Sequence, residues 1–228
     1  MKRLKIVSVI LTASVLAGIT SCSSEPAGTT SSSMEPTTTA EVETEATTAE
    51  PEITETTRID PQSTEPLCHI YFEEYDSFEV TSTDLVDGVW ADITSNTFLG
   101  ENLSPQLSWE PVEGAEEYVI YMVDRNSNGF LQWKSAGIKT TELPQGWTSN
   151  LTEYNGPHLG HGYTHIYDIY VIALRAPTTR LKGALNAANP RLEEFFEEID
   201  TDTEGNTGNI IAYGTISGIF TDARYRNI

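Results

Sequence analysis

The chain has 228 residues, of which 34 are acidic and 13 are basic, and its net charge is −21 at pH 7. This charge argues against nucleic acid as a partner, because proteins bind the phosphate backbone through clustered Lys and Arg side chains. The chain has two cysteines, which excludes a four-cysteine zinc site.

Residues 1–21 have the layout of a bacterial secretory signal peptide, with a basic start, an apolar run and small residues before Cys22. Ile19-Thr20-Ser21-Cys22 looks like a lipobox. This resemblance to bacterial lipoproteins implies cleavage before Cys22 and attachment of a diacylglycerol to its thiol. We therefore expect a protein held on the outer face of the cell membrane by its lipid anchor. An ordinary signal peptide or an anchor helix is the alternative.

Residues 22–66 comprise the predicted lipidated cysteine and a segment rich in Thr, Ser, Glu and Pro. Ten acidic residues and a single base, Arg58, fall in this segment. Its low hydrophobicity and self-repulsion predict a disordered tether.

Residues 67–228 are long enough for one domain with a sizeable core. Removing the ten acids of the tether and the four bases before residue 67 leaves this domain 24 acids, nine bases and a net charge of −15. Cys68 then has no cysteine partner, and we interpret it as a partly buried small side chain.

Strand-like segments dominate the domain, and β-branched or aromatic residues recur in them between Gly, Pro, Asn and Asp. The predicted strands are 78–83, 117–124, 134–140, 165–174 and 210–220. One helix is predicted over 189–200, with Asn189 as N-cap, Pro190 in its first turn, and one apolar stripe formed by Leu192, Phe195, Phe196 and Ile199. The pattern therefore predicts a mainly β domain.

Three of the four histidines lie close together in the stretch YNGPHLGHGYTHIYDIY, residues 154–170. The spacing of His158, His161 and His165 raises the possibility of a metal site, but the glycines between them argue against the helix that a His-Glu-x-x-His site requires. A hydrolytic triad is disfavoured because no Gly-x-Ser-x-Gly element occurs. We therefore expect no metal, no cofactor and no enzymatic activity.

Four blocks in order resemble the phosphatidylethanolamine-binding protein family, and specifically its bacterial Raf-kinase-inhibitor-like branch. The first is NLSPQLSW, residues 102–109, the most specific of the four. The others are DRNSNGFLQW (124–133), LPQG (143–146) with the stretch 154–174, and NIIAYGTISGIF (209–220). The resemblance implies an antiparallel Greek-key β-sandwich with a few peripheral helices, and a small surface pocket for anions such as phosphate or a phospholipid head group.

The resemblance also implies the pocket residues. Asp124 matches the first aspartate of the family's Asp-Pro-Asp element, Gly156 and Pro157 match its Gly-Pro loop, and His165 and Tyr167 match its His-x-Tyr. In such a pocket the anion is held by backbone N–H groups of the loop and by neutral or protonated donors. We expect Asp124 to accept a hydrogen bond from His165 or to fix the loop, because a bare carboxylate repels an anion.

Other positions depart from the family pattern. Gln132 stands where the family has a second histidine, Phe130 replaces an aromatic that is often Trp, and His158 is an additional histidine in the loop. Gln donates hydrogen bonds but never carries positive charge, so a weaker or differently selective pocket is expected. The alternative function is an interaction or inhibitor module of the cell envelope, which binds a protein partner and whose pocket is degenerate.

Overall fold

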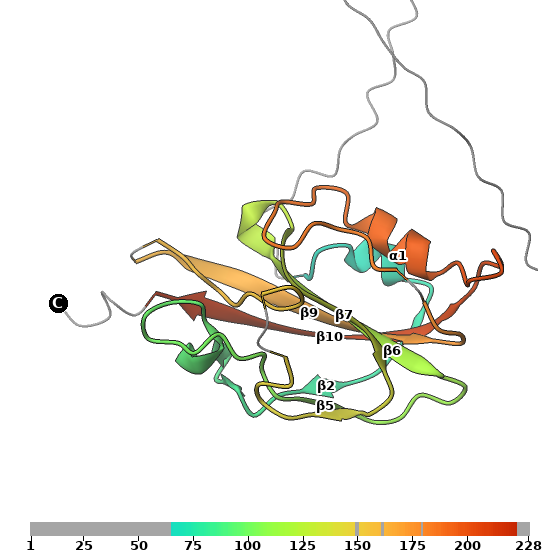
Figure 1. Ribbon diagram of the computed structural model, residues 1–228, viewed down its shortest axis with the longest axis horizontal. Helices are drawn as coiled ribbons and strands as arrows, with labels where there is room; N and C mark the ends of the chain where they lie inside the picture. Colours follow the sequence, from blue (N-terminus) through green and yellow to red (C-terminus); the bar gives the residue numbers. More distant parts are fainter. Residues whose placement is uncertain (1–64, 149–150, 161, 179, 223–228) are drawn as a thin grey trace, which may run out of the picture. The chain divides into compact units, whose positions relative to one another are not determined.

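The computed structural model describes residues 65–148, 151–160, 162–178 and 180–222 (Figure 1). The signal peptide, Cys22 and nearly all of the tether lie outside these residues, so the lipid anchor and the domain boundaries remain predictions. Within the described residues, no helix combines the length and the apolar character needed to cross a membrane.

A large sheet runs through the middle of the domain (Figure 1). Its strands within the described residues are β1 (Asp76–Ser77), β3 (Leu85–Val86), β4 (Val89–Trp90), β6 (Glu117–Asp124), β7 (Phe130–Ile138), β9 (Thr164–Leu174) and β10 (Ile210–Thr221). They lie in the order β3-β4-β10-β9-β6-β7, and β1 also pairs with β10. The four long strands β6, β7, β9 and β10 pair with one another in antiparallel fashion, as expected, whereas the short strands β1 and β4 pair with β10 in parallel. The sheet is therefore mixed.

A smaller antiparallel sheet covers one face of the large one. It consists of β2 (Val80–Thr81), β5 (Leu107–Trp109) and β8 (Glu142–Leu143), in the order β2-β5-β8. Buried side chains from both sheets form one hydrophobic core between them, which includes Leu107, Trp109, Ile120, Trp133 and Ile169. The predicted mainly β fold is confirmed.

The opposite face of the large sheet is covered by α1 (Glu193–Ile199) and by the short 3-10 turn η1 (His69–Phe72) (Figure 1). A second hydrophobic core lies there and contains Phe72, Tyr121, Tyr170 and the predicted stripe of the helix. Two further 3-10 turns are η2 (Asp92–Thr94) and η3 (Arg125–Ser127).

The central strands β6 and β9 are hydrophobic on both faces because each face has its own core. In β6, Tyr118, Ile120 and Met122 point toward the small sheet, while the residues between them point toward α1. All eight residues of β6 are buried. Side-chain alternation therefore places the next residue of this face, Asp124, at the strand end on the side of the small sheet.

The predicted helix is shorter at its start than expected. It begins at Glu193, and the stripe of Leu192, Phe195, Phe196 and Ile199 is buried as predicted. Asn189 does not cap it, because its side chain holds the preceding loop instead. Its Nδ2 donates to the carbonyl of Ala187 (2.7 Å).

Candidate functional site

The candidate site begins at Asp124, the last residue of β6. Asp124 stands opposite Phe130 on β7 and opposite Tyr167 on β9, so three predicted site residues lie in one row across the sheet. After Asp124 the chain turns into η3, and the Asp124 Oδ1 accepts a hydrogen bond from the backbone N–H of Asn126 (2.9 Å). Asp124 is 2% exposed, so its carboxylate is available only to groups that converge on the strand end.

His165 is the main partner of Asp124. Its Nδ1 lies 2.6 Å from the Asp124 Oδ2, and the Ser127 hydroxyl donates to the same oxygen (2.8 Å). Because a carboxylate only accepts, this contact places the imidazole proton on Nδ1. The His165 side chain keeps 22% of its surface exposed, against 3% for that of Asp124. The expected hydrogen bond between the two residues is present, and the imidazole forms the solvent side of the pair.

Tyr167 lies two residues after His165 on β9 and points to the same face, as expected for a strand. Its side chain is fully buried, and burial together with the Asp124 carboxylate raises the pKa of its hydroxyl. The interaction with Asp124 is electrostatic rather than a well-formed hydrogen bond, since the Tyr167 Oη has no hydrogen-bond partner within the described residues. A buried hydroxyl without a partner is costly and is a candidate ligand contact.

The Gly-Pro loop is packed tightly beside the site. A side chain at Gly156 would place its Cβ 1.9 Å from the Thr94 carbonyl oxygen, so only glycine fits. The Gly156 N–H donates to the Asn102 Oδ1 (2.7 Å), and the Pro157 carbonyl accepts from the Asn96 N–H (2.9 Å). The Gly156 N–H is therefore already used within the protein and proline has no N–H, so these two residues offer no N–H to an anion in this arrangement.

Gln132 supports the same loop. In β7 it stands between Leu131 and Trp133, which pair with consecutive residues of β6, so Gln132 is the extra residue of a β-bulge. Its side chain is 2% exposed. With the amide oriented to satisfy its surroundings, its nitrogen donates to the backbone carbonyls of Asn155 and Gly156. Gln132 therefore binds the loop and is not the hydrogen-bond partner of His165.

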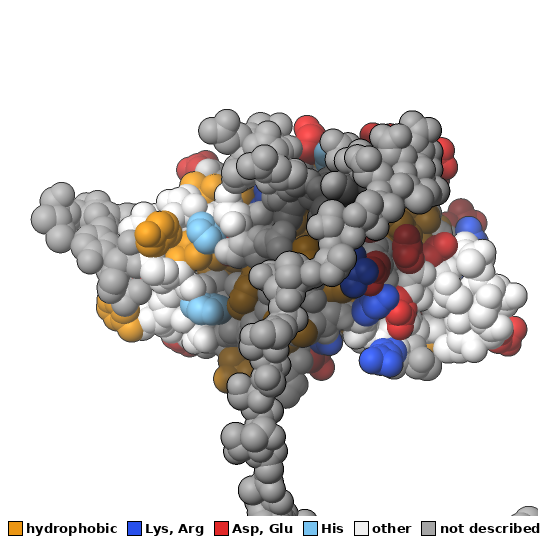
Figure 2. Space-filling view, turned by 90° about the horizontal axis from the view of Figure 1, so that it is seen from above, with side chains coloured by type: hydrophobic (Ala, Val, Ile, Leu, Met, Phe, Trp, Pro, Cys, Tyr) orange, Lys and Arg blue, Asp and Glu red, His pale blue; other side chains and the backbone are white. Residues whose placement is uncertain are grey.

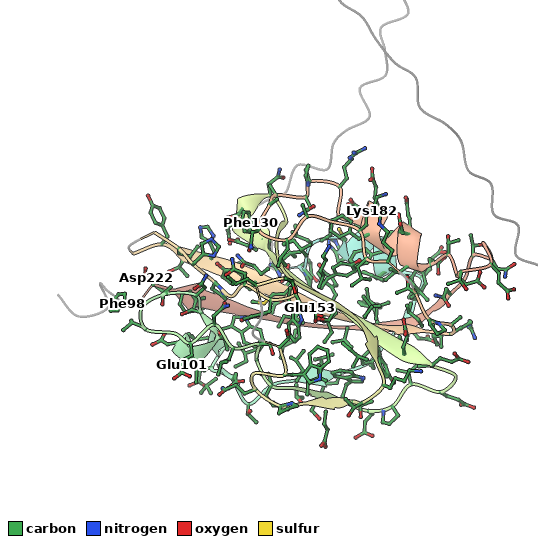
Figure 3. All side chains as sticks on the ribbon, in the orientation of Figure 1. Phe98, Glu101, Phe130, Glu153, Lys182 and Asp222 are labelled. Atoms are coloured by element: carbon green, nitrogen blue, oxygen red, sulfur yellow. The ribbon has the colours of Figure 1, made fainter. Side chains whose placement is uncertain are left out.

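Phe130 and His158 form an edge of the site. Their rings meet edge to face with centroids 5.9 Å apart, and the His158 Nδ1 lies 3.2 Å from the Gly156 carbonyl oxygen. His158 is exposed and Phe130 is half-buried. Figure 3 shows Phe130 beside the turn that follows β6. In the view of Figure 2, histidines lie next to hydrophobic side chains at one end of the surface, whereas most Lys, Arg, Asp and Glu side chains gather at the other.

The structure describes only some of the residues that the other hypotheses involve. His161 lies outside the described residues, and nowhere in them are three or more His, Cys, Asp or Glu side chains grouped to hold a metal ion. Burial and the nearby Glu193 raise the pKa of the Cys68 thiol, so this cysteine is a poor nucleophile. A groove of about 370 Å³ lies elsewhere, with a lining of Thr178, Arg180, Glu198, Thr201, Asp202 and Thr203, none of which is a predicted site residue.

Sequence reasoning missed a buried ion pair directly behind the site. The Arg125 guanidinium donates through Nε (2.9 Å) and through a terminal nitrogen to the Asp168 carboxylate, and the two side chains are 2% and 0% exposed. The signal was an isolated aspartate within the apolar run IYDIYVIAL, since a charge in a strand buried on both faces requires a partner.

Comparison with known proteins supports the assignment of the family. No curated protein matches the chain. Among solved structures, Escherichia coli YbcL, described as a new member of the mammalian PEBP family, has a TM-score of 0.47 at 20% identity and covers 63% of this chain and 98% of its own. CT736 of Chlamydia trachomatis, a putative phosphatidylethanolamine-binding protein homologue, has a TM-score of 0.44 at 19% identity and covers 64% and 97%. The family model of phosphatidylethanolamine-binding protein matches residues 81–211, more than half of the chain. The chain therefore belongs to the phosphatidylethanolamine-binding protein family.

Proposed function

We propose that the domain is a non-catalytic binding module for a small anion or a phosphate-bearing head group, tethered outside the cytoplasm by a lipid on Cys22. The observation that carries the proposal is the Asp124–His165 pair, beside which lies the buried Tyr167 hydroxyl, a group with no well-formed hydrogen bond to any described residue. The family's name, which refers to binding of a phospholipid, favours the same class of ligand.

The geometry supplies two groups for such a ligand. The Asp124 carboxylate accepts from His165, Ser127 and the Asn126 N–H, so its charge is largely compensated by the protein itself. Because Asp124 takes the Nδ1 of His165, the other ring nitrogen, Nε2, is left for a ligand. The Tyr167 hydroxyl would supply a second, neutral donor.

The composition of the site favours binding over catalysis. A serine nucleophile needs an adjacent general base that can accept its proton. The Ser127 hydroxyl instead donates to Asp124, and the nearest imidazole nitrogen, the His165 Nδ1, carries a proton and cannot act as that base. We therefore assign the site to recognition, with no cofactor.

A second candidate function is a protein-binding or inhibitory module of the envelope. This function is favoured because the Gly156 N–H and the Gln132 amide both donate hydrogen bonds to other groups of the protein. Fewer donors are then left for a small ligand than the family pattern implies. Tyr163 and Leu151, both more than 60% exposed, offer apolar contacts to a partner.

Titration of the full chain distinguishes the two candidates. Inorganic phosphate, phosphoethanolamine and acetate are added to protein labelled with ¹⁵N at its histidines, and the His165 imidazole is followed by NMR, with a His165→Asn variant for assignment. The proposal predicts a saturable shift at His165 for at least one of them. The absence of a shift up to tens of millimolar would refute small-anion binding and favour the protein-binding module.

A further inference from the structure

A buried polar cluster lies directly behind the candidate site, on the face of the large sheet that carries α1. Its centre is Asp168, which accepts hydrogen bonds from the Nε and one terminal nitrogen of Arg125, from the Ser217 hydroxyl (2.7 Å) and from the Leu67 backbone N–H (3.1 Å). The Asp168 carboxylate thus has donors for all of its acceptor positions. One carboxylate joins β9, β10, the turn after β6 and the first residue of the predicted domain.

The cluster shares its backbone with the site. Arg125 directly follows Asp124, and Asp168 directly follows Tyr167, while Asp124 and Tyr167 stand opposite each other in the sheet. Neighbouring residues of a strand point to opposite faces. The ion pair and the site therefore lie on opposite faces of the paired strands β6 and β9, at the point where β6 ends.

The turn η3 depends on this arrangement. Arg125 is its first residue, and Ser127, two residues later, holds the Asp124 carboxylate. The same turn contacts β9 between His165 and Tyr167, because the Asn126 Oδ1 accepts from the Ile166 N–H (2.8 Å). A shift of Arg125 would change the position of Ser127 and Asp124 relative to His165.

Stability alone does not account for an ion pair at this position. Removing two charges from water costs about as much as their attraction returns, and apolar residues of similar volume often replace such pairs without loss. A two-point contact between a guanidinium and a carboxylate instead fixes geometry.

We propose that the Arg125–Asp168 ion pair is a positioning element of the candidate site, which fixes η3 so that Asp124 and Ser127 meet His165. The proposal rests on the proposed binding function only for its consequence on affinity. The geometry it predicts is measurable without any ligand.

The test uses the full chain with Arg125→Met and Asp168→Leu combined, which removes both charges and keeps similar volumes. In ligand-free protein labelled with ¹⁵N at its histidines, the His165 Nδ1–H that donates to Asp124 gives a downfield proton resonance protected from exchange. We expect the double variant to fold and to lose this resonance, and its affinity for inorganic phosphate to fall about tenfold, the value of one hydrogen bond to a charged group. An unchanged His165 resonance in the folded variant overturns the proposal.

Two further variants separate positioning from general destabilisation. Phe196→Leu loosens the core on the same face without touching η3, and the His165 resonance should stay as in the parent. Arg125→Lys keeps the charge but loses the two-point contact, so it should fold and shift the resonance even if the double variant does not fold. The positioning role is refuted if the His165 resonance of Arg125→Lys is the same as that of the parent, or if Phe196→Leu changes this resonance as much as Arg125→Lys does. If the parent binds no phosphate, the proposed function fails, but the His165 resonance still decides this inference.

Discussion

The Asp124 Oδ2 and the His165 Nδ1 lie 2.6 Å apart and join the end of β6 to the start of β9. The carboxylate is buried and the imidazole is partly exposed. The His165 ring therefore faces solvent, while its hydrogen bond to Asp124 fixes its orientation and its tautomer. This contact distinguishes His165 from His158, although both histidines lie within the same eight residues of sequence.

His165→Ala should abolish most of the binding of small anions while the domain stays folded, because the side chain is partly exposed and its loss leaves no cavity in a core. We expect at least about a tenfold loss of affinity for phosphate, since one hydrogen bond to a charged group is removed. His158→Ala is the matched control and should change affinity less, as His158 contacts only the loop carbonyl and the Phe130 edge. Calorimetric titration of both variants measures the difference, and equal losses would contradict the assignment.

Gln132→His would restore the second histidine of the family pattern at a cost in stability. The two carbonyls that now accept from the amide would lose at least one donor, so we expect the free energy of unfolding to fall by about 1–2 kcal/mol. The new imidazole can be protonated, and phosphate affinity should therefore rise in mildly acidic buffer but not in mildly alkaline buffer. Urea unfolding and phosphate titration at the two pH values test both parts. A gain in affinity that is independent of pH would exclude a charged histidine as its cause.

Gly156→Ala should disrupt the loop that borders the site. Its Cβ would lie 1.9 Å from the Thr94 carbonyl oxygen, so the loop or the η2 region must move, and we expect a loss of about 3 kcal/mol or more of stability. Gly205→Ala is the control for packing, because no atom lies within 4 Å of the added Cβ; unlike Gly156, however, Gly205 has a φ (+87°) that is unfavourable for alanine. That variant should lose only about 1–2 kcal/mol. Urea unfolding of both proteins gives the comparison, and similar losses would show that packing at Gly156 is not limiting.

Alkaline pH should destabilise the domain through its buried tyrosines. Burial raises the pKa of Tyr121, Tyr154, Tyr167 and Tyr170 above the ordinary value near 10. The pKa of each of these tyrosines is higher in the folded than in the unfolded protein. Their contribution to stability is therefore complete below the unfolded-state pKa of about 10, and it is lost as the pH rises from there toward the folded-state pKa. Urea midpoints should thus fall steeply between about pH 10 and pH 11.

Tyr121→Phe provides the control for this pH dependence. The Tyr121 hydroxyl has no hydrogen-bond partner within the described residues, so the substitution removes a titrating group without breaking a bond. We expect unchanged or slightly higher stability at neutral pH and a shallower loss above about pH 10. A pH profile identical to that of the parent would show that Tyr121 does not contribute.

Much of the site follows from local sequence, and the exceptions have a common cause. The His-x-Tyr spacing on a strand places His165 and Tyr167 on one face. Asp124 was implied by the family resemblance, and its hydrogen bond to His165 was one of the two roles expected for it. The sequence did not predict the hydrogen bonds of the Gln132 amide and of the Gly156 N–H, because their acceptors come from distant segments, such as Asn102.

By itself, the sequence determined the strand-rich class, the apolar stripe of the helix and the family resemblance, because these depend on side-chain periodicity and on short contiguous motifs. Only the tertiary structure decided which polar groups are free. In it the Gly156 N–H and the Gln132 amide close a loop, the Tyr167 hydroxyl has no hydrogen-bond partner among the residues that the structure describes, and Arg125 pairs with Asp168 across 43 residues of sequence. A buried donor or acceptor is satisfied by whatever lies nearest in space, and that neighbour is set by the packing of the whole sheet.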